Sequence, residues 1–256
     1  MREFLARHMP PVYSAHGGEV DRIIVDTHVL MVVLFLFWGT FFVYALYRFR
    51  TRRSPKAAYS GMRSRWPLYS IAVVAVIELV DLFGLSIPAW SHWASPLAAM
   101  QKPLELRIVG EQFAWNVHYA GPDGIFGRAS LKFVNNDNPL GLDPADPNAK
   151  DDIVSLNELH LEVNRPVLVH ITSKDVIHSF KLPVMRAEQD AIPGMDVAIH
   201  FTPVRTNNGE EWEIACAQLC GLGHYRMRGM LFVDTANDLQ TWLASQETAL
   251  SALEQQ

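Results

Sequence analysis

The two cysteines of this 256-residue chain are spaced four residues apart, and a histidine and a methionine follow them closely. They are Cys216, Cys220, His224 and Met227. Thiolate, imidazole and thioether groups are the ligands that copper prefers, so the set is compatible with a soft-metal site. Two other interpretations use the same residues. Two nearby thiols can pair as a disulfide in an oxidising compartment, and these spacings also fall on one face of a helix.

The sequence around the cysteines favours a loop. Gly221 and Gly223 separate Cys220 from His224 and disfavour a continuous helix. The flanking stretches WEIAC and RGMLFV are rich in β-branched and aromatic residues, which is typical of strands. We therefore predict a loop between two strands, with a metal site preferred over a disulfide.

Two apolar stretches near the N-terminus are each long enough to cross about 30 Å of hydrocarbon as a helix. They span residues 23–47 and 67–90. The second contains Glu78 and Asp81, which lie three apart and so share one helix face. Charged groups inside a membrane usually face a bundle interior or a proton path. Both a proton path and polar contacts with a partner protein are compatible with this pair.

The segment between these stretches, residues 48–66, predicts the orientation. It carries seven basic residues and no acid: Arg48, Arg50, Arg52, Arg53, Lys56, Arg63 and Arg65. By the positive-inside rule it is cytoplasmic, which places both termini outside. A nucleic-acid site is a poor explanation for a short loop between two spans. We predict a two-helix transmembrane hairpin, with residues 1–22 as an external N-terminal segment.

The remaining part, residues 91–256, is acidic and rich in strand patterns. It contains 21 Asp and Glu against 12 Lys and Arg, a balance of −9, which attracts basic partners. Alternating segments such as LELRIVGEQFAWNVHY and HLEVNRPVLVHITS are separated by turn-formers, which favours an antiparallel sandwich or barrel. We expect this all-β domain at 91–235 and a C-terminal amphipathic helix at 236–256.

A metal site needs more ligands than the cysteine loop holds. Of the histidines upstream in the external part, His160, His170 and His200 lie in strand-like alternation and look like ordinary strand residues. His178 differs, because DVIHSF ends a strand-like run that breaks at Pro183. We expect His178 to join the loop.

Together, DVIHSF, AIPGM and CAQLCGLGHYRM resemble the sequence signature of subunit II of haem–copper cytochrome c oxidases, the subunit that carries the dinuclear CuA centre. EQFAW and the two apolar stretches match that family in order. The resemblance implies a cupredoxin-like Greek-key domain. It implies that Cys216 and Cys220 bridge two coppers, that His178 and Met227 complete one, and that His224 and the carbonyl of Gln218 complete the other.

The resemblance also implies a role. Such a subunit of a bacterial-type inner membrane, with its copper domain on the periplasmic side, accepts electrons from a cytochrome c-like donor. It passes them to the haems of subunit I, where oxygen is reduced to water. Electrons would enter near Phe113 and Trp115, and the donor would dock there and at Asp175. The sequence contains no CxxCH motif, so we expect no c-type haem attached to it.

Three positions depart from the family pattern. Phe113 stands where many members have tryptophan, and His118 replaces an acidic residue. Gln218 replaces a glutamate that reaches a magnesium ion at the boundary with subunit I, so we expect a weak magnesium site there. Two alternative functions are compatible with parts of this pattern. One is a membrane-tethered copper-binding or delivery module. The other is a quinol oxidase subunit II, which is disfavoured because all copper ligands are present.

Overall fold

The structure is a computed structural model that describes residues 2–53, 64–93 and 102–251. It divides into a helical unit, Met1–Met9 with Glu19–Ala94, and a second unit, Pro10–Gly18 with Ser95–Gln256, that is mainly a β-sandwich. The predicted basic loop at 48–66 lies partly outside the described residues, because 54–63 includes Lys56 and Arg63.

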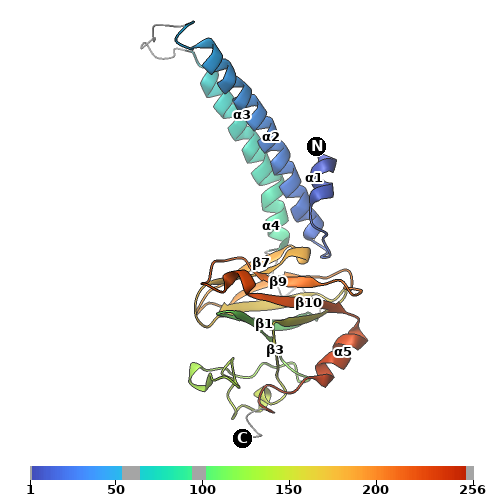
Figure 1. The fold of residues 1–256 in the computed structure, drawn as a ribbon. Helices are drawn as coiled ribbons and strands as arrows, with labels where there is room; N and C mark the ends of the chain where they lie inside the picture. Colours follow the sequence, from blue (N-terminus) through green and yellow to red (C-terminus); the bar gives the residue numbers. More distant parts are fainter. Residues whose placement is uncertain (1, 54–63, 94–101, 252–256) are drawn as a thin grey trace. The chain divides into compact units, whose positions relative to one another are not determined.

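The helical unit contains the two long apolar helices that the sequence predicted. Its elements are α1 (Arg2–His8), α2 (Gly17–Arg48), α3 (Trp66–Asp81), a π-helical turn (Leu82–Ser86) and α4 (Ile87–Trp93) (Figure 1). α2 has 32 residues, and the second helical run has 26 over Trp66–Ser91. In both helices, the most apolar segment is left fully unburied by the rest of the described chain. Helices that are apolar all round and this long are suited to lipid.

The second unit holds ten strands in two sheets, which Figure 1 shows as two layers. The strands are β1 (Leu104–Glu111), β2 (Ala114–Tyr119), β3 (Ile153–Leu156), β4 (Glu158–Glu162), β5 (Val167–Ser173), β6 (His178–Leu182), β7 (Ala187–Ala191), β8 (Val197–Phe201), β9 (Trp212–Cys216) and β10 (Arg228–Asp234). One sheet has the order β3-β2-β1-β5-β8 and the other β4-β10-β9-β6-β7. The prediction of an all-β sandwich is confirmed, but the sheets are mixed instead of antiparallel, because β1 pairs with β5 and β10 with β4 in parallel.

The core lies between the two sheets, because each strand turns alternate apolar side chains inward. In β1 these are Leu106 and Ile108, and both are completely buried. Trp115 from the first sheet meets Phe180 from the second edge-to-face, with ring centroids 5.4 Å apart. Such aromatic pairs stabilise by about 0.5–1.5 kcal/mol beyond their burial. This packing fixes the ends of β6, β9 and β10, where the candidate ligands lie.

A long excursion, residues 120–152, joins β2 to β3. In Figure 1 it lies on the side of the first sheet away from the second. It is held by polar contacts. The side-chain amide of Asn138 donates to the Leu142 carbonyl at 2.8 Å and accepts from the Leu142 N–H at 2.9 Å. Asp152, at its end, accepts from the Gly127 N–H and pairs with His118 at 2.7 Å. The sequence indicated turns here but not this ordered covering layer.

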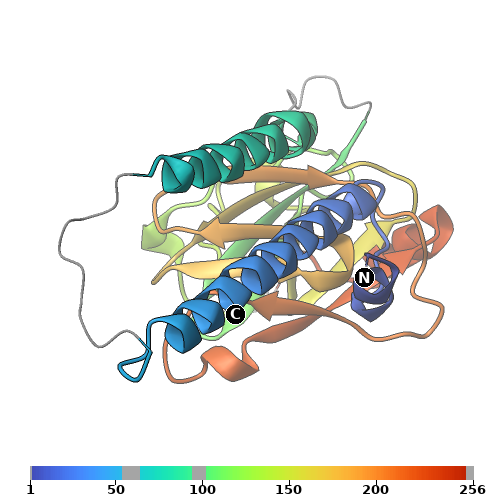
Figure 2. The ribbon, with the colours of Figure 1, turned by 90° about the horizontal axis from the view of Figure 1, so that it is seen from above.

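The C-terminal helix α5 is shorter than the sequence suggested. It runs Ala236–Ser245 instead of 236–256, and Thr235 caps it by accepting the Asp238 N–H. It lies at one edge of the sandwich in both views (Figure 2). After it, the chain turns back: the Ala249 N–H donates to the Asp152 carbonyl at 2.7 Å, and Leu250 packs with Leu142. The packing of residues 249–250 against the excursion outweighs the helix propensity of the segment after Ser245. Residues 252–256 lie outside the described part of the chain.

Candidate metal centre

The candidate ligands converge because they lie at or near the ends of three neighbouring strands. His178 begins β6, Cys216 ends β9, and Met227 immediately precedes β10. β9 pairs with both β6 and β10, and Phe180 of β6 lies opposite Cys216. The loop between β9 and β10 carries Cys220 and His224 back towards this point.

All five side-chain donors lie within contact distance of a cysteine sulfur. Cys216 Sγ is 3.8 Å from Cys220 Sγ and 3.9 Å from His178 Nδ1. Cys220 Sγ is 3.6 Å from His224 Nδ1 and 3.7 Å from Met227 Sδ. The carbonyl oxygen of Gln218 lies 3.2 Å from Cys216 Sγ. His178, Cys216 and Cys220 alone form a compact group suited to a metal ion.

This geometry excludes the two competing interpretations for the described chain. The cysteines are free, and 3.8 Å is far longer than the roughly 2.05 Å of a disulfide bond. Residues 217–223 form no helix, and only a short 3₁₀ turn follows at His224–Arg226. The prediction of a loop between two strands is confirmed.

The donors are sheltered while the tip of the loop is open. His178, Cys220 and Met227 are buried, and Cys216 and His224 are half-buried. Around them, the side chains of Leu219, Leu222 and Tyr225 are exposed. The candidate donors are therefore shielded from solvent, while the apolar rim beside them is open to contact with another molecule.

The donor chemistry fits copper. Burial, and then the neighbouring Cys216, raise the pKa of the Cys220 thiol to about 11. Because a thiol must lose its proton to become a metal ligand, metal binding at Cys220 would release this proton. Two sulfur atoms from cysteine, one thioether and two imidazoles are a soft set that favours copper over magnesium or calcium.

Asp175 is a positioning group for His178. Its Oδ1 lies 2.8 Å from His178 Nε2, which directs Nδ1 towards Cys216. Burial raises the pKa of this carboxyl, but hydrogen bonds from His178 and from the N–H groups of Gln112 and Val176 outweigh it, so the net pKa is lowered. The sequence suggested Asp175 for donor docking, whereas its oxygens are engaged here.

Gln112 ties the loop to this carboxylate, and the sequence did not single it out. Its backbone N–H donates to Asp175 Oδ2 at 2.6 Å. Its side-chain amide donates to the carbonyl of Cys220, also at 2.6 Å. Gln112 directly precedes Phe113 in EQFAW, and this position was the only feature of the sequence that could have pointed to its role.

Phe113 and Trp115 have different settings. Phe113 is half-buried, and its ring lies against the backbone of Gly221 and Gly223. Trp115 is completely buried. Its ring lies edge-on to the His178 ring, with the two ring centroids 5.9 Å apart. Of the two residues predicted for electron transfer from the donor, only Phe113 reaches the surface.

Glu78 and Asp81 lie far from the candidate ligands in sequence, at the C-terminal end of α3. Neither has an ion-pair partner among the residues the structure describes. The π-helical turn starts directly after Asp81, and the Leu82 N–H donates to the carbonyls of Glu78 and Leu79.

These features define a copper-type donor cluster at one end of a β-sandwich, in a chain that also carries two lipid-suited helices. Comparison with known proteins gives the family. Residues 104–233 match the family described as cytochrome c oxidase subunit II, periplasmic domain. The chain belongs to the cytochrome c oxidase subunit II family. It is therefore a membrane protein and a subunit of a haem–copper oxidase, which implies subunit I as a partner.

Two relatives agree with this assignment in sequence, and one solved structure is similar. The alternative cytochrome c oxidase subunit 2 of Bradyrhizobium diazoefficiens is 31% identical over 236 residues, covering 92% of this chain and 83% of the relative. Cytochrome c oxidase subunit 2 of Synechocystis sp. is 26% identical over 264 residues, covering 94% and 76%. The periplasmic domain of subunit II from Bradyrhizobium japonicum aligns with 57% of this chain and 95% of its own, at 26% identity and a TM-score of 0.41.

Proposed function

We propose that this chain is the electron-accepting subunit of its oxidase and holds a dinuclear CuA centre. Cys216 and Cys220 would bridge two coppers. His178 and Met227 would complete one of them, and His224 with the Gln218 carbonyl the other. When bound, such a centre takes up and releases one electron with little change in geometry.

The observation that carries the proposal is the contact of each cysteine sulfur with the other and with further donors. Cys216 lies beside His178 and the Gln218 carbonyl, and Cys220 beside His224 and Met227. Sulfurs in such central positions suit two metals, whereas a delivery site needs only a few exchangeable ligands for one ion. Quinol oxidase subunit II, which lacks these ligands, remains disfavoured.

The chain's own residues would hold this geometry. Asp175 orients the His178 imidazole, and Gln112 restrains the Cys220 carbonyl. The packed ends of β6, β9 and β10 limit movement of the donors. The chain receives electrons from a cytochrome c-like donor at the exposed rim and passes them to the haems of subunit I.

Replacing one sulfur tests this proposal. Cys220→Ser removes a contact to three other donors, so we expect loss of copper from the subunit and collapse of donor oxidation. The haem content of the purified oxidase should persist. A Cys220→Ser oxidase with full copper content and full electron-transfer rate would exclude the assignment, and a single exchangeable copper in the unaltered chain would favour the delivery module.

We also propose a weak magnesium site at Gln218. Its side chain is exposed and supplies an amide oxygen where magnesium prefers charged, hard ligands. Growth in manganese followed by EPR spectroscopy tests this. Tightly held stoichiometric Mn²⁺ that is lost on Gln218→Ala would show that the amide is sufficient.

For Glu78 and Asp81 we propose a site facing subunit I, as a proton path or as polar contacts. Acidic groups in a span are costly unless paired, and π-helical turns are frequent at functional sites. Proton-coupled turnover that is unchanged by Glu78→Gln would remove the proton-path role.

We propose that residues 1–22, the β-sandwich and the C-terminus are periplasmic. The accessibility of single introduced cysteines to a membrane-impermeant reagent would test this orientation.

A further inference from the structure

The outer face of the first sheet is hollowed beneath the excursion 120–152. The cavity there has a volume of about 420 Å³, within the usual range for small-molecule sites. None of its lining residues is a candidate copper ligand.

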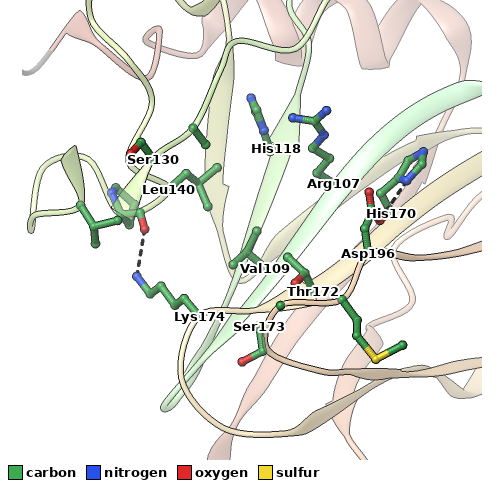
Figure 3. A pocket seen from close by; sticks show the side chains of 15 residues that line it. Arg107, Val109, His118, Ser130, Leu140, His170, Thr172, Ser173, Lys174 and Asp196 are labelled. Atoms are coloured by element: carbon green, nitrogen blue, oxygen red, sulfur yellow. Dashed lines mark hydrogen bonds and ion pairs between the residues drawn. The ribbon is translucent and has the colours of Figure 1, made fainter. Parts of the chain in front are cut away.

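A row of basic side chains crosses the floor of this cavity. Arg107 of β1 lies opposite His118 of β2 and His170 of β5. Directly opposed residues in neighbouring strands project from the same face of a sheet, so all three belong to one side. In Figure 3, Arg107 and His118 extend next to each other and His170 lies beyond Arg107.

Arg107 differs from its two neighbours because it lacks a carboxylate. His118 is paired with Asp152 at 2.7 Å, and His170 lies 3.0 Å from Asp196 and 3.3 Å from Glu105. Among the described residues, no acid lies within ion-pair distance of Arg107. Its guanidinium carbon lies 4.2 Å from the ring centroid of Phe126. The Phe126 ring supplies no counter-charge, and a half-buried cation without one is costly, so a bound anion would offset that cost.

The rest of the lining restricts the anion. Val109, Val134, Leu140 and Met195 supply apolar walls. Lys174 already pairs with Glu111 and donates to the Pro139 carbonyl at 3.0 Å. The carboxylate of Asp196 at the cavity repels a multiply charged ligand.

We propose that this cavity binds a small organic carboxylate. The planar guanidinium of Arg107 matches a carboxylate with two parallel hydrogen bonds, and the apolar body of the ligand would contact Val109, Leu140 and Met195. This site is independent of the copper proposal, because it shares no residue with it.

Equilibrium dialysis of radiolabelled benzoate against the detergent-solubilised oxidase tests the proposal, with empty micelles as the blank. We expect one saturable site that depends on this chain. Arg107→Gln should weaken it at least about tenfold, the effect of losing one charged hydrogen bond. Met195→Glu, which places a repelling carboxylate at an exposed wall position, should abolish binding while leaving Arg107 intact.

Arg165→Gln is the matched control, because Arg165 is paired with Glu162 and does not line the cavity. It should leave benzoate affinity within about twofold, and all variants should keep the thermal unfolding midpoint and visible spectrum of the oxidase. Neutral benzamide should not compete. Absence of saturable binding, equal competition by benzamide, displacement by inorganic phosphate alone, or full affinity in Arg107→Gln would each overturn the proposal.

Discussion

The carboxylate of Asp175 lies 2.8 Å from Nε2 of His178, on the opposite side of the imidazole from Cys216. A hydrogen bond of this kind selects the tautomer whose Nδ1 is free for a metal. We therefore expect Asp175 to support the candidate metal centre, while its role in donor docking stays a prediction.

Removing that support should weaken copper binding without removing a ligand. We expect Asp175→Ala to lower copper affinity by about 10–100-fold, as for other partners of metal-bound histidines, and Asp175→Asn to lower it less because the amide oxygen still accepts. Competition against a copper chelator measures this. Asp190→Ala, an exposed change in neighbouring β7, is the control. Unchanged copper affinity in Asp175→Ala, with only the rate of donor association reduced, would support donor docking instead.

Gln112 should stabilise the loop even without metal. Gln112→Ala removes the amide donor to the Cys220 carbonyl and should cost about 1 kcal/mol of unfolding free energy. Gln112→Glu should cost more, because it directs a carboxylate oxygen at a carbonyl oxygen. Denaturant unfolding of the copper-free chain compares the two, and equal stability of all three proteins would show that the bond contributes nothing.

Gly223 should tolerate no side chain. A Cβ added there would lie 2.5 Å from Cδ2 of Phe113, while its φ of −91° is open to alanine. The cost of Gly223→Ala is therefore steric, about 1–3 kcal/mol, and Phe113→Ala should relieve part of it in the double variant. Gly18→Ala, where the added carbon meets nothing within 4 Å, is the control. Thermal unfolding that shifts equally in both single variants would refute close packing.

The acidic balance of residues 91–256 should steer a basic donor. The second-order rate of donor oxidation should fall as ionic strength rises, because salt shortens the range of the attraction. Stopped-flow kinetics over a salt series measures this. A rate that stays flat would indicate a tethered donor or one bound only by apolar contact with the rim at Leu219, Leu222 and Tyr225.

The sequence was sufficient for the features that depend on local order. The apolar stretches predicted α2 and α3, and the glycines between Cys220 and His224 predicted a loop. His178 was singled out as the end of a strand-like run before Pro183, whereas the structure places it at the start of β6.

Features that depend on strand register were beyond the sequence. Arg107, His118 and His170 are far apart in the chain, and only the pairing of β1 with β2 and β5 aligns them. The engagement of Asp175 by Gln112 requires a contact across 63 residues. The end of α5 at Ser245 depends on the excursion against which Leu250 packs.

The central claim is that two coppers share the sulfurs of Cys216 and Cys220. The most direct measurement is copper content together with EPR spectroscopy on the purified full chain after copper loading. The account predicts two coppers per chain and a hyperfine pattern from one unpaired electron shared by two copper nuclei, both lost in Cys216→Ser. One copper per chain with the pattern of a single nucleus would contradict it.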